Sequence, residues 1–157
     1  MGRAEISSCG RYRWRLERAG ARPLAFVMLN PSRADAASDD PTVRRCLALA
    51  RGSGHCGLVI GNLYALRAPN PRELRADPDP IGPENDAALA RLAGECAARG
   101  EPIVCAWGNH GPQARAEAVT ALLRAAGARL VCLGLTARGA PRHPLYAPRG
   151  VALVPFP

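Results

Sequence analysis

The chain has 157 residues, 48% of them hydrophobic, and this amount of apolar side chain predicts a single domain with a packed core. No apolar run approaches the roughly 18 residues of a membrane span, and the first residues lack a basic segment followed by a long apolar one. We therefore expect a cytoplasmic protein with no membrane partner. The six cysteines include no C-x-x-C pair, which argues against a zinc site, an iron–sulfur cluster and a redox dithiol.

The formal charge is +8, and all 21 basic residues are arginine. Arginine forms forked hydrogen bonds with phosphate and stacks on bases, so this arginine-rich composition favours an anionic partner such as nucleic acid. A GC-rich genome would also enrich arginine, and the charge alone therefore leaves nucleic-acid binding open. The sequence indicates no obligate protein partner.

Apolar runs along the chain predict the strands. Residues 11–17 alternate polar and apolar side chains, which predicts an N-terminal edge strand with Tyr12, Trp14 and Leu16 turned inward. Four continuous apolar runs predict buried central strands, at residues 24–29, 57–63, 103–107 and 128–133. Residues 151–155 could add a short terminal strand.

Helical patterns lie between these runs, at about residues 41–51, 83–99 and 112–126. Asp40 and Pro41 have the residue types of a helix cap and a first turn. The connection 64–83 is rich in proline, aspartate and arginine, and loops of this length are often functional. The order of elements predicts an α/β fold, a three-layer α/β/α sandwich with a mostly parallel four-stranded central sheet.

In such a sheet the loops that follow the carboxyl ends of the strands gather at one edge, where α/β proteins bind ligands. Four polar residues are predicted to meet there, namely Asn30, Asn62, His110 and His143. Pro31 biases Asn30 away from helical geometry, so the Asn30 amide should project from the end of its strand. Taken singly, each residue has a plain interpretation as a turn, a cap or an exposed side chain. Together they predict a site.

Four short motifs occur in the order found in the uracil-DNA glycosylase superfamily. L-N-P-S at residues 29–32 resembles its G-x-N-P-G motif, and L-V-I-G-N at 58–62 resembles the strand with its base-recognising asparagine. W-G-N-H-G-P-Q-A at 107–114 resembles its W-G-x-x-A-Q segment, and H-P-L at 143–145 resembles its H-P-S-P-L loop. Nearly the whole chain also resembles a small bacterial family, domain of unknown function 1643, which has an L-N-P-S-x-A-D motif and implies no activity.

The glycosylase resemblance implies a uracil-DNA-glycosylase-like fold and a DNA glycosylase of base excision repair, a cofactor-free hydrolase that excises a modified or deaminated base. Asn30 would hold the attacking water, and His143 would donate a hydrogen bond to the departing base. Asn62 would recognise the base edge, and Leu145 would fill the gap left by a flipped base. The other substrate-binding residues that it implies are Pro31, Ser32, Tyr64, His110 and Arg142, with Arg138 and Arg142 meeting phosphates.

The chain departs from the glycosylase pattern in four ways. One is that Asp35, Asp39 and Asp40 are not part of that pattern. Ser32 stands where mismatch-specific glycosylases have glycine, and the late loop is H-P-L-Y. The aromatic residue that would stack on the base is unassigned, because Phe26 lies within a strand and Tyr64 follows Asn62. The sequence leaves open which base is excised and whether the substrate is DNA, RNA or a free nucleoside.

Two other functions are compatible with the sequence. Asp35, Asp39 and Asp40 could bind magnesium and, with His110 or His143, form a phosphoryl-transfer or nucleotide-hydrolysing site. Against this, Asp40 suits a helix cap and Asp39 has a favourable charge beside the same helix terminus. A nucleotide- or nucleic-acid-binding module without catalysis would have the same fold and charge.

Overall fold

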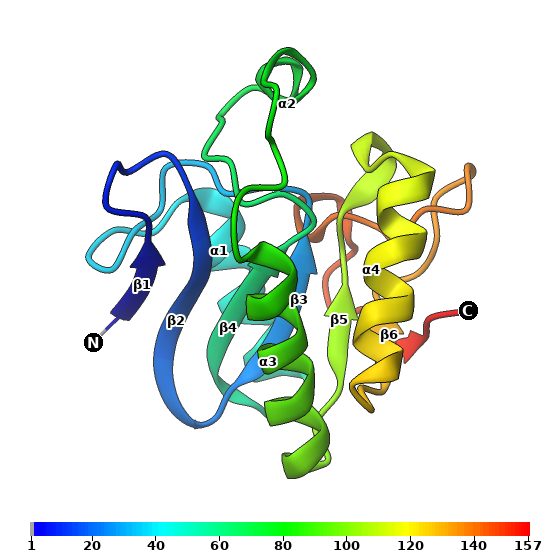
Figure 1. Cartoon of the computed structure of the whole chain (residues 1–157). Coiled ribbons are helices and arrows are strands. Elements are labelled where there is room, and N and C mark those ends of the chain that lie inside the picture. The colour runs from blue at the N-terminus through cyan, green and yellow to red at the C-terminus, as the bar shows by residue number, and fades with distance from the viewer. Residues whose placement is uncertain (1) are drawn as a thin grey trace.

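The computed structural model describes residues 2–157 and contains one mixed seven-stranded sheet, in the order β1-β2-β4-β3-β5-β6-β7 (Figure 1). The strands are Gly2–Ile6 (β1), Arg13–Arg22 (β2), Leu24–Met28 (β3), Cys56–Asn62 (β4), Ile103–Cys105 (β5), Leu130–Cys132 (β6) and Val154–Pro155 (β7). The four central strands β4, β3, β5 and β6 are parallel, as predicted. The sheet nevertheless has seven strands rather than four, because β1, β2 and β7 extend it with antiparallel pairings.

The prediction of an edge strand at residues 11–17 was wrong in position and length. The strand is β2, which spans 13–22 and lies between β1 and β4. β1 forms the edge and pairs with β2 from Gly2 opposite Arg18 to Ile6 opposite Arg13. The β1 sequence G-R-A-E-I has one large apolar residue, so no alternating pattern distinguishes it as a strand.

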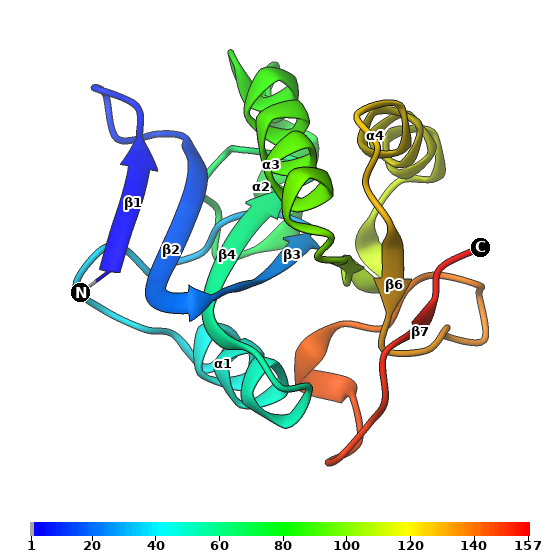
Figure 2. The ribbon, with the colours of Figure 1, turned by 90° about the horizontal axis from the view of Figure 1, so that it is seen from below.

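Helices cover both faces of the sheet (Figure 2). α1 (Pro41–Gly52) packs on one face, while α3 (Asn85–Arg99) and α4 (Gln113–Ala125) pack on the other. This double cover explains why all five residues of β3 are buried and why the strand is a continuous apolar run. α1 begins as predicted, since the Asp40 side chain accepts a hydrogen bond from the Val43 N–H (2.9 Å) and Pro41 occupies the first turn.

The long connection 64–83 contains a short helix, α2 (Pro71–Ala76), which the sequence did not predict. Asn70 caps it by accepting a hydrogen bond from the Arg72 N–H (3.0 Å). The connection is tied to the segment after β3, because the Tyr64 N–H donates to the Leu29 carbonyl and the Ala68 N–H donates to the Pro31 carbonyl. In Figure 1 α2 therefore stands above the sheet, beyond the carboxyl end of β3.

The order of the central strands defines where a ligand site is expected. From β3 the chain passes through α1 to β4, and from the neighbouring β5 it passes through α4 to β6, on the other side. The connections after β3 and β5 thus diverge, and open α/β sheets bind ligands in the crevice at such a point.

No helix within residues 2–157 has the length and apolar composition needed to cross a bilayer.

Candidate functional site

A cavity of about 620 Å³ lies at this divergence. Its walls come from β2, the end of β3, the first turn of α1, residues 68–71, the segment 107–110 and the loop after β6. Six of the predicted site residues line it: Asn30, Ser32, His110, Arg142, His143 and Leu145. The cavity thus brings these six residues together at the carboxyl ends of the strands, and their role as a functional site stays a prediction.

Asn30 is half-buried at the end of β3, and its amide has two distinct environments. The Nδ2 group donates to the carbonyl oxygens of Ala68 (2.7 Å), Pro31 (3.0 Å) and Leu66 (3.3 Å). The Oδ1 atom has no hydrogen-bond partner among the residues that the structure describes. The three backbone acceptors fix the amide so that its oxygen is the acceptor available to a molecule in the cavity.

His143 is held in one tautomer by its own turn. The Nδ1 atom accepts a hydrogen bond from the Leu145 N–H at 3.2 Å, so the proton of the neutral ring is on Nε2. Burial lowers the pKa of His143, while the nearby Asp40 carboxylate raises it to a smaller extent. His143 therefore lines the cavity as a neutral imidazole that has one N–H to donate.

Two contacts position the loop of His143. Arg45 in α1 donates from Nη2 to the carbonyl oxygens of Ala147 (2.8 Å) and Pro148 (3.0 Å). The Gly108 N–H donates to the Pro141 carbonyl (2.9 Å), which joins this loop to the segment after β5. Gly108 has a positive φ of 71°, and a Cβ at this position would lie 3.4 Å from the Cβ of His143. Glycine thus permits both the backbone conformation and the close approach of the two loops.

Three predicted site residues lie outside the cavity lining: Pro31, Asn62 and Tyr64. Asn62 is only 1% exposed, and neither of its side-chain polar atoms has a partner within residues 2–157. Its position in β4, two residues after Ile60, places its side chain on the α1 face of the sheet. Tyr64 is buried in the cluster on the opposite face, and Pro31 is also buried.

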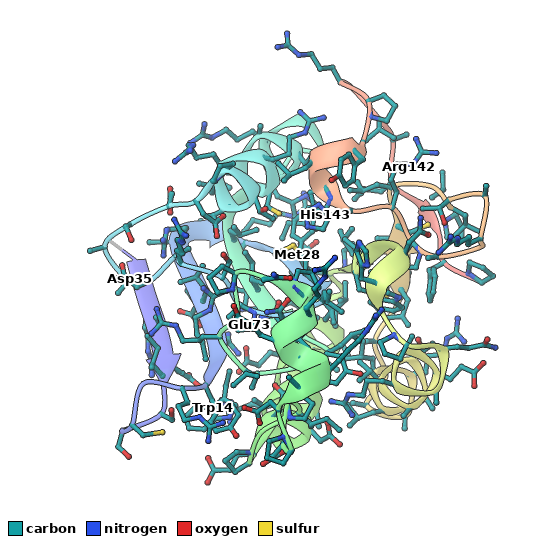
Figure 3. All side chains as sticks on the ribbon, turned by 90° about the horizontal axis from the view of Figure 1, so that it is seen from above. Trp14, Met28, Asp35, Glu73, Arg142 and His143 are labelled. Carbon is teal, nitrogen blue, oxygen red and sulfur yellow. The ribbon has the colours of Figure 1, made fainter. Side chains whose placement is uncertain are left out.

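The three aspartates of the proposed metal site are separately engaged. Asp35 accepts hydrogen bonds from the backbone of Ala37 and Ser38, and Asp39 pairs with Arg18 (2.6 Å). Asp40 caps α1, and it alone of the three lines the cavity. Figure 3 shows Asp35 beside β1, at a distance from Met28 and His143. Residues 2–157 contain no group of three or more histidine, cysteine or carboxylate side chains suited to hold a metal ion.

Sequence reasoning missed several polar and aromatic residues of the cavity, among them Arg13, Thr42 and Tyr146. Tyr146 is 79% exposed, and its ring centroid lies 5.9 Å from that of His143. Arg13 faces away from Tyr12 and Trp14, as the alternating pattern implied, but it is only 3% exposed, because the loop that contains Ala34 covers it on that face. The pattern fails at Leu16, which packs with α1 on the opposite face from Tyr12 and Trp14, because β2 has a bulge at Trp14, where Glu5 pairs with Arg15 and the adjacent Ile6 pairs with Arg13.

Comparison with known proteins identifies a family and no characterised relative. A family model described as a protein of unknown function (DUF1643) matches residues 13–145, a span that begins at Arg13 and ends at Leu145. No curated protein and no solved structure matches the chain. The resemblance to uracil-DNA glycosylases therefore remains a prediction from four motifs.

Proposed function

We propose that this chain, which belongs to the DUF1643 family of proteins of unknown function, hydrolyses the N-glycosidic bond of a nucleotide with a modified or deaminated base. In this reaction water attacks the anomeric carbon, and the carbon–nitrogen bond breaks with its electron pair moving to the base. The water proton passes to the departing base or to solvent. The transition state needs an acceptor that orients water and a donor that stabilises the developing negative charge.

The observation that carries the proposal is that one cavity presents both groups. Asn30 offers an Oδ1 acceptor that its Nδ2 contacts hold in place. His143 offers an Nε2–H donor because the Leu145 N–H occupies Nδ1. A neutral imidazole suits this role, since its Nε2–H can donate a hydrogen bond to the negative charge that develops on the leaving base. Both residues are on segments that follow central strands, and they meet at the divergence of the sheet connections.

Exposed side chains next to His143 in the chain support a nucleic-acid substrate. Leu145 is 47% exposed and Tyr146 is 79% exposed, so two large apolar side chains flank His143 on the surface. Such side chains can wedge into or stack on bases that are no longer paired. Arg142 lines the same cavity, and no carboxylate pairs with it in the described part of the chain. We propose DNA as the nucleic acid, with Arg142 meeting a phosphate.

The test is an assay for alkali-sensitive abasic sites. The protein is incubated with labelled single- and double-stranded oligonucleotides that contain uracil, hypoxanthine or an alkylated base. Wild-type protein should produce abasic sites in excess EDTA, whereas Asn30→Ala should bind the same oligonucleotide and lose rate, because the water is needed for reaction rather than recognition. Asp39→Ala is the matched control, since Asp39 pairs with Arg18 outside the cavity and should leave the rate unchanged. Activity that survives Asn30→Ala and is abolished by Asp39→Ala would favour phosphoryl transfer instead.

A further inference from the structure

Arg13 is a buried cation without a counter-ion. Its Nη1 donates to the Ala34 carbonyl oxygen (2.6 Å), and its Nε is shielded from solvent without any hydrogen-bond partner in residues 2–157. No carboxylate of the described chain lies within 4.0 Å of the guanidinium, although Asp40 and Asp35 are near enough to favour its charge and Arg67 and Arg18 oppose it. Burial lowers the pKa of Arg13 to about 10, so the side chain is still charged at neutral pH.

A comparison with Arg15 shows how unusual this environment is. Arg15 is also buried and lies two residues along β2, but it pairs with Glu17 and Glu95. An arginine buried without an anion is costly, because its desolvation is not offset by a partner. Arg13 faces the cavity side of the sheet, opposite to Tyr12 and Trp14, and the next residue forms a bulge of the kind that is common beside functional sites.

Hydroxyl groups lie on the cavity wall with Arg13. Ser32 and Thr42 both line the cavity, and neither hydroxyl makes a hydrogen bond to any residue that the structure describes. Thr42 is in the first turn of the 12-residue helix α1, whose terminus has a positive partial charge. Asp40 caps that helix and places one carboxylate on the same wall, bonded to the Val43 N–H. A guanidinium fork with two hydroxyls suits a tetrahedral anion with several acceptor oxygens.

We propose that Arg13, with Ser32 and Thr42, binds the phosphate group of the nucleotide that the cavity accepts. β2 and the loop after β6 lie on opposite sides of β3 in the sheet, so a ligand that contacts both Arg13 and His143 crosses the ends of the central strands. In this arrangement a nucleotide has its base at His143 and its phosphate at Arg13. The cavity volume of about 620 Å³ is within the range of small-molecule sites. That the ligand is a nucleotide rests on the proposed function, whereas the anion site itself rests on the buried, unpaired charge of Arg13.

The test compares Arg13→Met with Arg15→Met in thermal unfolding and binding. Inorganic phosphate should raise the Tm of the wild type and of Arg15→Met but not that of Arg13→Met. Without phosphate, Arg13→Met should keep or exceed the wild-type Tm, because the change removes an uncompensated charge, while Arg15→Met should melt earlier. An equal phosphate-induced shift in Arg13→Met and the wild type would overturn the proposal.

Calorimetric titrations then identify the source of the phosphate. Uridine monophosphate represents a terminal phosphate, and a short uracil-containing single strand represents a phosphodiester. The probe that enters the site should bind at least roughly 30-fold more weakly to Arg13→Met, and uridine should bind equally to both proteins. If neither phosphorylated probe loses affinity, the proposal is wrong. Phosphate binding without base release would instead refute the glycosylase and retain the anion site.

A second variant covers the case in which Arg13→Met does not fold. The double variant Ser32→Ala with Thr42→Val keeps Arg13 and removes the two hydroxyl donors. It should bind phosphate about tenfold more weakly than the wild type, as expected for the loss of hydrogen bonds to a charged group. Wild-type phosphate affinity in this variant would contradict the assignment of Ser32 and Thr42 to the site.

Discussion

Replacing His143 by asparagine separates the two roles that the structure gives this side chain. In the native turn Nδ1 accepts a hydrogen bond from the Leu145 N–H at 3.2 Å, while Nε2–H is the donor available to the cavity. Asparagine has an acceptor oxygen at the position of Nδ1 and commonly caps turns of this kind. Its side chain ends one atom short of Nε2. His143→Asn should therefore keep the turn and lose the donor.

The expected magnitudes differ for the two roles. Removal of a preorganised donor to a developing anion costs on the order of 10²–10³ in rate. The capping bond contributes about 1 kcal/mol to stability. His143→Asn should thus lose the rate while its unfolding free energy stays within about 0.5 kcal/mol of wild type. His143→Ala should lose both, with a Tm lower by about 2–4 °C.

The assay measures base release in a single turnover, with protein in excess over a labelled oligonucleotide, beside thermal unfolding of the same samples. Single-turnover rates report the chemical step without product release. A His143→Asn rate within about twofold of wild type would refute the donor role. A large loss of rate in His143→Ala alone would show that His143 acts by holding its loop.

Four further outcomes follow from the geometry of the site. Asn30→Asp should destabilise the protein by about 1–3 kcal/mol in urea unfolding, because a carboxylate would face three carbonyl oxygens that now accept from Nδ2; unchanged stability would contradict these bonds. Gly108→Ala should lower the unfolding free energy by about 1 kcal/mol or more, since its φ of 71° is unfavourable for alanine; an unchanged value would contradict that backbone geometry. Burial lowers the pKa of His143, so folding favours the neutral ring, and stability should fall as the pH drops from above about 6.5 through the lowered pKa; His143→Asn should lack this component. Binding to duplex DNA should weaken with salt by a slope of roughly −0.9 per neutralised phosphate, and Arg142→Ala should reduce that slope without changing base preference; affinity that ignores salt would argue against phosphate contacts.

The central strands were predictable because each is buried on both faces, which leaves a continuous apolar run such as Leu24–Met28. β1 was not predictable, because a strand at the edge of a sheet needs few apolar residues and β1 has only one large one, Ile6. The helix α2 was missed because it is six residues long and has a single buried side chain, Leu74. Its capping asparagine and following proline, Asn70 and Pro71, are the signals that could have indicated it.

For the candidate site, chain order alone predicted that Asn30 and His143 come together, because both follow parallel strands. The same rule did not predict that the Asn62 side chain is buried on the α1 face of the sheet. Burial at a strand end depends on how α1 and the loops pack there. The alternating pattern placed Arg13 opposite to Tyr12 and Trp14 but did not predict its burial, which depends on the loop that contains Ala34. The bulge in β2 places Leu16 on the opposite face from Trp14, and a one-residue bulge leaves no mark on an alternating pattern.

Product analysis by mass spectrometry tests the central claim most directly. A uracil-containing oligonucleotide is incubated with the wild-type protein, and the masses of the strand and of the released small molecules are measured. Hydrolysis of the N-glycosidic bond predicts free base together with a strand of unchanged length that has lost that base. Release of phosphate or a shortened strand with every base still attached would contradict the account.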